Sequence, residues 1–353
     1  MWYIQSNLIF YGLTISFHRS KEVFVCSLIV SLRCVFWVAP SIREGGIDSP
    51  RPASQRAAAF ILTAAMLTTL AAPAFAGTWY IEDGDIAVKA GETEGTNKVS
   101  QGANQEVEDT DTIIKNREDT ASSNTVTIDA GSDKVEVTLK DVNIDTSSRN
   151  KAAVSVTGSG NTTIKLDGDN HLTGGNGDIY GGDGITSSGS LTISGGTVTA
   201  TGGDSTDSDG SGGSGIYSVS GDVTISGGST VTAKGGDGNF SGGCGIYGSL
   251  TVSDGTVTAN GGNGGNVSGD GIRSDGGVTI SGGTVKAAGG DSKDGYGGDG
   301  IRSGGGVTIS GNTVNAAGGN GGKVGGYGIC SFDRVAISGG TVEAAGGSSG
   351  SSN

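Results

Sequence analysis

The chain has 353 residues, of which 70 are glycine, and a formal net charge of −14. Such a glycine content is typical of disordered, low-complexity chains, but valine and isoleucine recur at fixed offsets through residues 181–348, which a disordered chain has no reason to maintain. No basic cluster is present that could neutralise phosphates, so we expect no nucleic acid partner.

Residues 1–50 differ in composition from everything that follows them. They are apolar and aromatic, and they precede a segment with the features of an export signal. We interpret residues 1–50 as a mis-annotated or disordered extension that results from a wrongly assigned start codon. The alternative is a membrane segment at 23–38, which Arg33 interrupts.

Residues 51–76 have the three parts of a secretory signal peptide. Arg51 and Arg56 supply the positive charge, an apolar run follows over 57–72, and Ala74-Phe75-Ala76 forms a small-residue cleavage site. A membrane anchor is the alternative, because the apolar run approaches spanning length. Cleavage after Ala76 predicts an extracellular or cell-surface protein whose mature form has no membrane span.

Residues 77–180 are predicted to form an amino-terminal cap followed by irregular coils. The cap is assigned to the amphipathic stretch 78–90, and the polar residues 91–120 are expected to form a loop. Strand-like runs follow at 125–145 and 151–175. Within them, AAVSV and TTIKL match the pattern of phrases that recur later in the chain.

Residues 181–348 contain six glycine-rich repeats, followed by a flexible tail at 349–353. Each repeat has three apolar phrases, G-I-x-S, V/L-T-I/V-S and T-V-x-A. The isoleucines of the first phrase lie 31, 30, 26, 29 and 28 residues apart, at Ile185, Ile216, Ile246, Ile272, Ile301 and Ile329. Loop length varies mainly between the third phrase and the next G-I, which in solenoids is often the binding edge.

Each phrase alternates apolar with polar residues, which is the periodicity of a β-strand. Val, Ile and Thr favour a pleated surface, and the Gly-Gly pairs between phrases are expected to form turns with positive φ. No helical period, leucine-rich pattern or collagen triplet is present. Three strands per unit of about 28 residues predict one coil of a parallel β-helix, an all-β solenoid in which equivalent residues stack into ladders.

The stretches TWYIEDGDI, TTIKLDGDNHL and LTISGGTVTATGG resemble those of bacterial secreted carbohydrate-binding-domain proteins with a pectin-lyase-like β-helix. The resemblance covers roughly residues 78–348. It implies a right-handed parallel β-helix and an extracellular or cell-surface location. For some members it also implies Ca²⁺ and binding to plant-type polysaccharide.

The outward position after each G-I forms a candidate binding stripe. Aromatic faces stack on sugar rings and Arg forks grip carboxylates, so the stripe could hold an acidic polysaccharide of plant or host origin. An ordinary exposed strand face is the alternative. The four candidate residues are Tyr217, Tyr247, Arg273 and Arg302.

Acidic residues also recur at equivalent positions of the repeats. Carboxylates on loops suit Ca²⁺, but Asp is equally a turn residue that bonds its own backbone. The candidate ligands lie after the Gly-Gly pairs or before G-I, at Asp183, Asp204, Asp237, Asp270, Asp291 and Asp299.

Together these patterns predict a secreted or surface-attached, non-catalytic carbohydrate-binding or adhesion module. A structural surface stalk is one alternative, and a pectate-lyase-like polysaccharide lyase is another. For the lyase, Asp270, Asp299, Arg273 and Arg302 would have to supply the chemistry. All four lie inside a repeated phrase, whereas an active site normally interrupts a repeat, so we expect no enzyme.

Overall fold

The structure is a computed structural model that describes residues 8–10, 13–20, 23–27 and 76–350. The chain divides into two compact units, residues 1–69 and 70–353. In the first unit, an antiparallel sheet is formed by β1 (Leu8–Phe10), β2 (Leu13–Ser20) and β3 (Val23–Ser27).

The expected signal peptide lies outside the described residues except for Ala76. Within the described part of the chain, no helix is long and apolar enough to cross a membrane.

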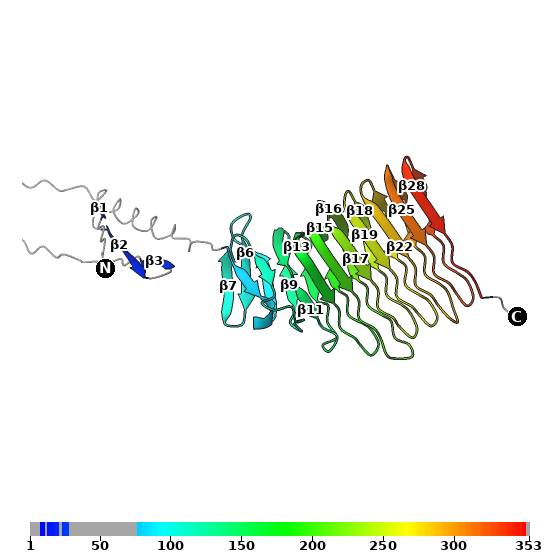
Figure 1. Ribbon diagram of the computed structural model, residues 1–353, viewed down its shortest axis with the longest axis horizontal. Helices are drawn as coiled ribbons and strands as arrows, with labels where there is room; N and C mark the ends of the chain where they lie inside the picture. The colour runs from blue at the N-terminus through cyan, green and yellow to red at the C-terminus, as the bar shows by residue number, and fades with distance from the viewer. Residues whose placement is uncertain (1–7, 11–12, 21–22, 28–75, 351–353) are drawn as a thin grey trace, which may run out of the picture. The chain divides into compact units, whose positions relative to one another are not determined.

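The second unit is a right-handed parallel β-solenoid of about 8 turns with about 28 residues per coil. Its strands stack side by side from β6 and β7 at one end to β28 at the other (Figure 1). Each coil contributes one strand to each of three ladders, and several strands bend at a corner and serve two ladders in succession. The fold therefore agrees with the three phrases of the sequence.

The first ladder contains the G-I-x-S strands. AAVSV takes this position, as expected, because Val154 pairs with Ile185. The strands are β5 (Ile86–Ala90), β9 (Val126–Asp129), β12 (Val154–Thr157), β14 (Ile185–Ser187), the first parts of β16 (Ile216–Ser226) and β18 (Ile246–Val252), β20 (Ile272–Ser274), β23 (Ile301–Ser303) and β26 (Ile329–Ser331).

The second ladder contains the V-T-I strands, and TTIKL joins it through the pair Ile164 and Ile193. Its members are β4 (Thr78–Tyr80), β8 (Ile113–Lys115), β10 (Lys134–Lys140), the first parts of β13 (Asn161–Thr173) and β15 (Ser190–Thr201), the second parts of β16 and β18, β21 (Val278–Ile280), β24 (Val307–Ile309) and β27 (Val335–Ile337).

The third ladder contains the T-V-x-A strands. Its members are β11 (Asn143–Asp145), the second parts of β13 and β15, β17 (Thr230–Lys234), β19 (Thr256–Asn260), β22 (Thr284–Ala288), β25 (Asn312–Ala317) and β28 (Gly340–Ala345).

Five apolar side chains per coil fill the interior, as the alternation predicts. In one coil Ile216, Val223, Ile225, Val231 and Ala233 are each 0% exposed. Apolar side chains stack on similar ones along the axis, as Val223 does on Leu191 and Leu250, so each coil completes the core of its neighbour. A single coil could not bury these residues by itself.

The serine of G-I-x-S also points inward and is buried. Its hydroxyl donates to a carbonyl at the corner that follows, for example from Ser187 to Gly189 at 2.8 Å and from Ser218 to Gly221 at 2.7 Å. A buried hydroxyl is costly without a partner, and this bond supplies one while it fixes the corner.

The amino-terminal end is covered by a hairpin where a loop was expected. Strands β6 (Asn97–Gln101) and β7 (Asn104–Asp109) pair antiparallel with each other, and β6 also pairs antiparallel with β5. A short 3-10 helix at Ile81–Asp83 precedes β5. The loop expectation was wrong because two of the three residues that β6 buries, Asn97 and Gln101, are polar and give no apolar alternation.

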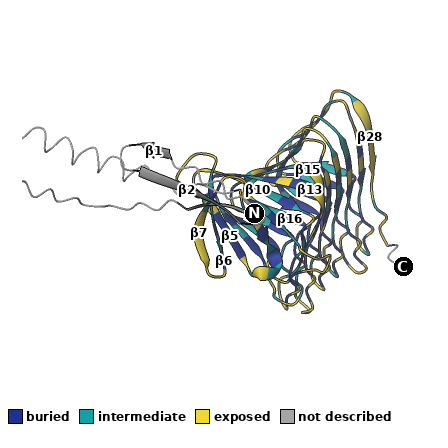
Figure 2. Cartoon of the chain, turned by 60° about the vertical axis from the view of Figure 1, so that its left-hand side comes forward, coloured by how far each residue is buried: buried dark blue, intermediate teal, exposed yellow. Residues whose placement is uncertain are grey.

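At the opposite end the core positions are more exposed. Val335 is 44% and Ile337 52% exposed, whereas their ladder neighbours Val307 and Ile309 are buried. Figure 2 shows β28 largely in the colour of exposed residues. Ser349 still pairs with Gly321, so the stacking continues to the last described residues.

The loop after each third-ladder strand forms what we call a glycine arm, an outgoing and a returning pass of chain that lie side by side. The arms run parallel to one another in Figure 1. The six arms comprise residues 174–184, 202–215, 235–245, 261–271, 289–300 and 318–328.

A zigzag of backbone hydrogen bonds holds the arms together. Gly243 donates to Gly236 of the same arm at 2.9 Å, Gly262 of the next arm donates to Gly243 at 2.8 Å, and the pattern continues from Gly175 to Gly347. A Cβ built on Gly262 would lie 2.0 Å from the carbonyl oxygen of Gly236.

The glycine pairs therefore serve close approach of two backbones. Among the described glycines, those with positive φ lie outside the arms, at positions such as Gly195 and Gly283 between the second and third strands. The expectation of turns with positive φ was therefore wrong for the Gly-Gly pairs of the arms, but it was confirmed for pairs between the second and third strands, such as Gly195-Gly196 and Gly282-Gly283.

Candidate functional site

The acidic residues after the Gly-Gly pairs form a hydrogen-bonded ladder on the outgoing passes. The side-chain oxygen of each accepts the backbone N–H of the equivalent residue one coil further on, for example Asp204 from Asp237 at 2.7 Å and Asp237 from Asn263 at 2.7 Å. The ladder extends through Asn176, Asp204, Asp237, Asn263, Asp291, Asn320 and Ser348.

The acidic residues before G-I make the same kind of bond on the returning passes. Asp183 accepts from Ser214 at 2.8 Å, and Asp270 accepts from Asp299 at 2.7 Å. Asp299 in turn accepts from Tyr327 at 2.7 Å. Both acidic series thus have a structural role that links coil to coil.

Two of these carboxyls have strongly raised pKa values. Burial raises the pKa of Asp183 to about 6. Burial, with a smaller contribution from the neighbouring Asp299, raises the pKa of Asp270 to about 6. The charged form is disfavoured because little water reaches these side chains.

The six predicted calcium ligands fall on two separate ladders, one after the Gly-Gly pairs and one before G-I. Within the described residues, no group of three or more His, Cys, Asp or Glu side chains is placed to hold a metal ion. Calcium binding stays a prediction.

The predicted binding stripe lies on the outward side of the first ladder, and its four residues are brought together in one row. Register pairs join Tyr217 to Tyr247, Tyr247 to Arg273 and Arg273 to Arg302. The two tyrosine rings lie 5.0 Å apart at 38°. The guanidinium of Arg273 lies over the ring of Tyr247 at 5.7 Å, so the row forms one continuous aromatic and cationic surface.

Hydrogen bonds and ion pairs hold the side chains of this row. The hydroxyl of Tyr247 donates to Asp275 at 2.5 Å, and this bond raises the pKa of Tyr247 to about 12. Nη1 of Arg302 lies 3.4 Å from Oδ2 of Asp299, while the corresponding distance from Arg273 to Asp270 is 4.0 Å. The arginine side chains are 38% and 43% exposed, so both can still meet a ligand.

A second wall faces this row, and the sequence did not reveal it. The tips of successive arms pair into their own ladder, in which Val267, Tyr296 and Val324 are exposed and adjacent. Lys323 lies over the ring of Tyr296 at 5.7 Å. Several arm phrases have a large residue among glycines, as in NVSGD and DGYGGD, and that pattern is the signal that could have indicated this wall.

Between the two walls lies a groove, which we call the glycine-floored groove. Asp270, Asp299 and the returning-pass glycines 297, 325 and 326 line it, together with Arg273 and Arg302 of the row, Tyr296 of the arm wall and Tyr327, which follows Asp299 in the returning-pass ladder. Its volume is about 220 Å³. Its lining residues come from three successive coils, so the groove spans these three coils along the solenoid axis.

A family model described as the beta helix repeat matches residues 191–215, 223–246, 278–301 and 335–352. The first three segments each begin at a second-ladder strand and end at or next to the following first-ladder strand. These segments are β-helix repeats. The search of curated proteins returned no match, and the search of solved structures returned none.

Proposed function

We propose that the protein is a non-catalytic binding module that holds a linear acidic polysaccharide in the glycine-floored groove. The observation behind the proposal is the alignment of Tyr217, Tyr247, Arg273 and Arg302 in one row, whose two arginines line the groove together with the arm wall. A polymer with repeating rings and carboxylates matches a groove that repeats its aromatic and cationic groups along one axis. The resemblance to secreted carbohydrate-binding proteins supports the same proposal. On the same resemblance we propose that the protein is exported and displayed at the cell surface.

The groove offers the two kinds of contact that such a ligand needs. Tyr296 in the groove and Tyr247, next to Arg273 in the row, present ring surface, which stacks on sugar faces. Arg273 and Arg302 present guanidinium forks, each of which can bind a carboxylate in bidentate fashion. The ion pairs of these guanidinium groups with Asp270 and Asp299 are long, at 4.0 and 3.4 Å. A ligand carboxylate could therefore replace them with little loss of interaction energy.

The direct test is a titration of the protein with oligogalacturonate, with and without EDTA. We expect binding, and we expect the double variant Arg273→Ala/Arg302→Ala to weaken it by about tenfold or more, since hydrogen bonds to charged groups contribute about 1.5–3 kcal/mol each. Lys286→Ala is the matched control, because Lys286 is an exposed cation of the third ladder outside the groove. Equal affinity of the double variant and the control would overturn the proposal.

The alternatives give different outcomes in the same experiment. A structural stalk predicts no affinity for oligogalacturonate or for any other glycan tested. The paired Asp and Asn ladders favour this second candidate, because they strengthen the stack without serving a ligand. A lyase predicts unsaturated products that absorb ultraviolet light, and loss of binding in EDTA would indicate that Ca²⁺ takes part.

A further inference from the structure

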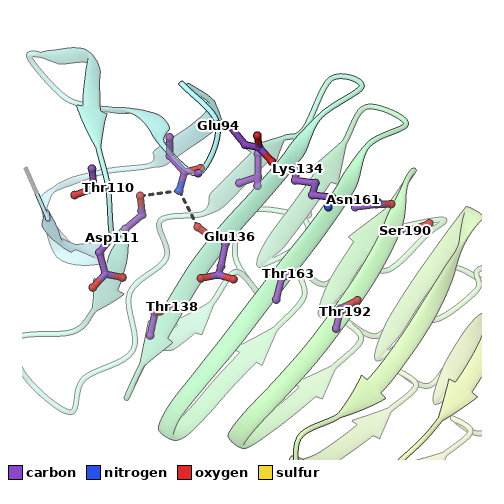
Figure 3. Close-up of a pocket in the computed structure, with 14 residues that line it drawn as sticks. Glu94, Thr110, Asp111, Lys134, Glu136, Thr138, Asn161, Thr163, Ser190 and Thr192 are labelled. Carbon is purple, nitrogen blue, oxygen red and sulfur yellow. Dashed lines mark hydrogen bonds between the residues drawn. The ribbon is translucent and has the colours of Figure 1, made fainter. Parts of the chain in front are cut away.

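A second cavity lies away from the groove, at the amino-terminal end of the solenoid. Its volume is about 530 Å³. It opens where the cap overhangs the outer face of the second ladder, whereas the groove lies against the first ladder. We call it the cap cleft (Figure 3).

The floor of the cap cleft is a regular grid of polar side chains from three successive strands. One row is Lys134, Asn161 and Ser190, and the second is Glu136, Thr163 and Thr192. These rows follow directly from the register, because outward residues alternate along β10, β13 and β15 and stack from coil to coil. The floor therefore presents hydroxyl, amide, amine and carboxylate groups in fixed positions.

The wall of the cleft is fixed to this floor. Asn97, which is only 6% exposed, donates to the Thr112 hydroxyl at 2.9 Å and to the backbone carbonyl of Glu136 at 2.7 Å. The bond to Glu136 joins the cap to β10 across 39 residues of sequence. A wall anchored in this way gives a preformed cleft, which lowers the entropy that a ligand must lose on binding.

The chemistry of the lining selects hydroxyl-rich ligands. Thr138, Thr163, Thr192 and Ser190 carry hydroxyls that both donate and accept, and Asn161 adds an amide. The volume falls within the range of about 300–1,000 Å³ that is usual for small-molecule sites. A mono- or disaccharide has the matching density of donors and acceptors.

The charges of the lining select further among saccharides. Glu94, Asp111 and Glu136 face the cleft with one lining cation, Lys134, and Lys165 pairs with Glu136 at 2.5 Å from outside the lining. Carboxylates thus exceed cations in the cleft, whereas the groove lining has two arginines and two aspartates. Such a field attracts a cationic ligand.

We propose that the cap cleft binds a short saccharide with a protonated amine, of the hexosamine class. Hydroxyls of the ligand bond to the grid, and its ammonium group lies among Glu94, Asp111 and Glu136. The cleft is a second binding site, independent of the groove and of opposite charge preference.

The test compares three disaccharides of similar ring size by calorimetric titration of the full chain. They are the glucosamine dimer, its N-acetylated counterpart and cellobiose, which has hydroxyls where the others have nitrogen. We expect the glucosamine dimer to bind most tightly at low salt, and Glu94→Gln to weaken it roughly two- to fivefold, as loss of one exposed charge pair implies. Equal binding of all three, or no binding of any, would overturn the proposal.

Two further variants locate the site without depending on the acidic residues. Thr192→Val should weaken the glucosamine dimer, while Thr251→Val, at the same ladder position two coils further on and outside the cleft, should not. Arg273→Ala/Arg302→Ala should leave binding of the glucosamine dimer unchanged. If both threonine variants had the same affinity, or if the arginine variant abolished binding, the ligand would not lie in the cap cleft.

Discussion

At the scale of single residues, the main role of the aspartates in the repeats is to form hydrogen bonds from one coil to the next. Asp204 and Asp237 each bind the backbone of the next coil, and Asp270 does the same while its pKa is raised to about 6. A buried carboxyl that accepts an N–H contributes to the stack in either protonation state, but its charged form is costly. The stability of the protein should therefore depend on pH.

For Asp270 the sign of this dependence follows from the raised pKa. The folded state holds the proton more tightly than the unfolded chain does, so the stabilisation is fully present below about pH 4 and is lost as the pH rises through about 6. A shift of about two pKa units corresponds to roughly 3 kcal/mol. Asp270→Asn keeps the acceptor for the Asp299 N–H and removes the titration.

We expect Asp270→Asn to flatten the slope of unfolding free energy against pH between about 4 and 7, measured by urea denaturation. Asp183→Asn should have the same effect, because burial raises the pKa of Asp183 to about 6 as well. An unchanged slope in both variants would show that these carboxyls are not buried in solution.

At the scale of elements, the glycine arm is the feature that distinguishes this solenoid. Two passes of chain approach so closely that only glycine fits, and each bonds the other through backbone groups. The arm holds one wall of the groove and supplies its floor. Its role is thus to build a flat surface that places Tyr296 opposite Arg302.

A pair of glycine substitutions tests this account with opposite signs. Gly262→Ala would place a Cβ 2.0 Å from the Gly236 oxygen, so we expect a loss of roughly 1–3 kcal/mol in unfolding free energy from overpacking. Gly277 lies at an exposed corner with its nearest neighbour at 3.4 Å and no positive φ. Gly277→Ala should be neutral or stabilising by up to about 1 kcal/mol, because it restricts the unfolded chain. Equal effects of the two substitutions in denaturation curves would contradict the close packing of the arms.

At the scale of the whole molecule, the solenoid is a one-dimensional stack in which each coil contacts only its neighbours. Val278 pairs with Val307, and the same register continues through the coils on either side. Removal of one complete coil should therefore leave a continuous ladder. The rest of the stack would not need to change.

We predict that deletion of residues 278–306 gives a folded protein, because it joins Gly277 to Val307 in register. Its urea m-value should fall by about one eighth, in proportion to the surface lost from about 8 turns. Deletion of residues 278–292 removes part of a coil, misaligns every later ladder and should prevent cooperative folding. Circular dichroism with urea denaturation distinguishes the two, and similar behaviour of both deletions would contradict the in-register stack.

The sequence alone determined the fold of the repeats, because the information lies in local alternation. Val, Ile and Thr at period two define the strands, and their return every 26 to 31 residues defines the coil. The same alternation placed Tyr217, Tyr247, Arg273 and Arg302 in one outward row. Hydrophobic periodicity reports which face a side chain takes, and stacking then follows from the repeat.

Only the tertiary structure decided what the glycines and the cap do. The backbone of Gly243 forms hydrogen bonds with the backbones of Gly236 and Gly262. The side-chain amide of Asn97 anchors the cap by a hydrogen bond to a backbone carbonyl 39 residues away. Backbone contacts and buried polar pairs leave no periodic apolar signal in the chain. The close packing of the arms and the cap cleft both depend on such contacts, so neither could be predicted from the order of residues.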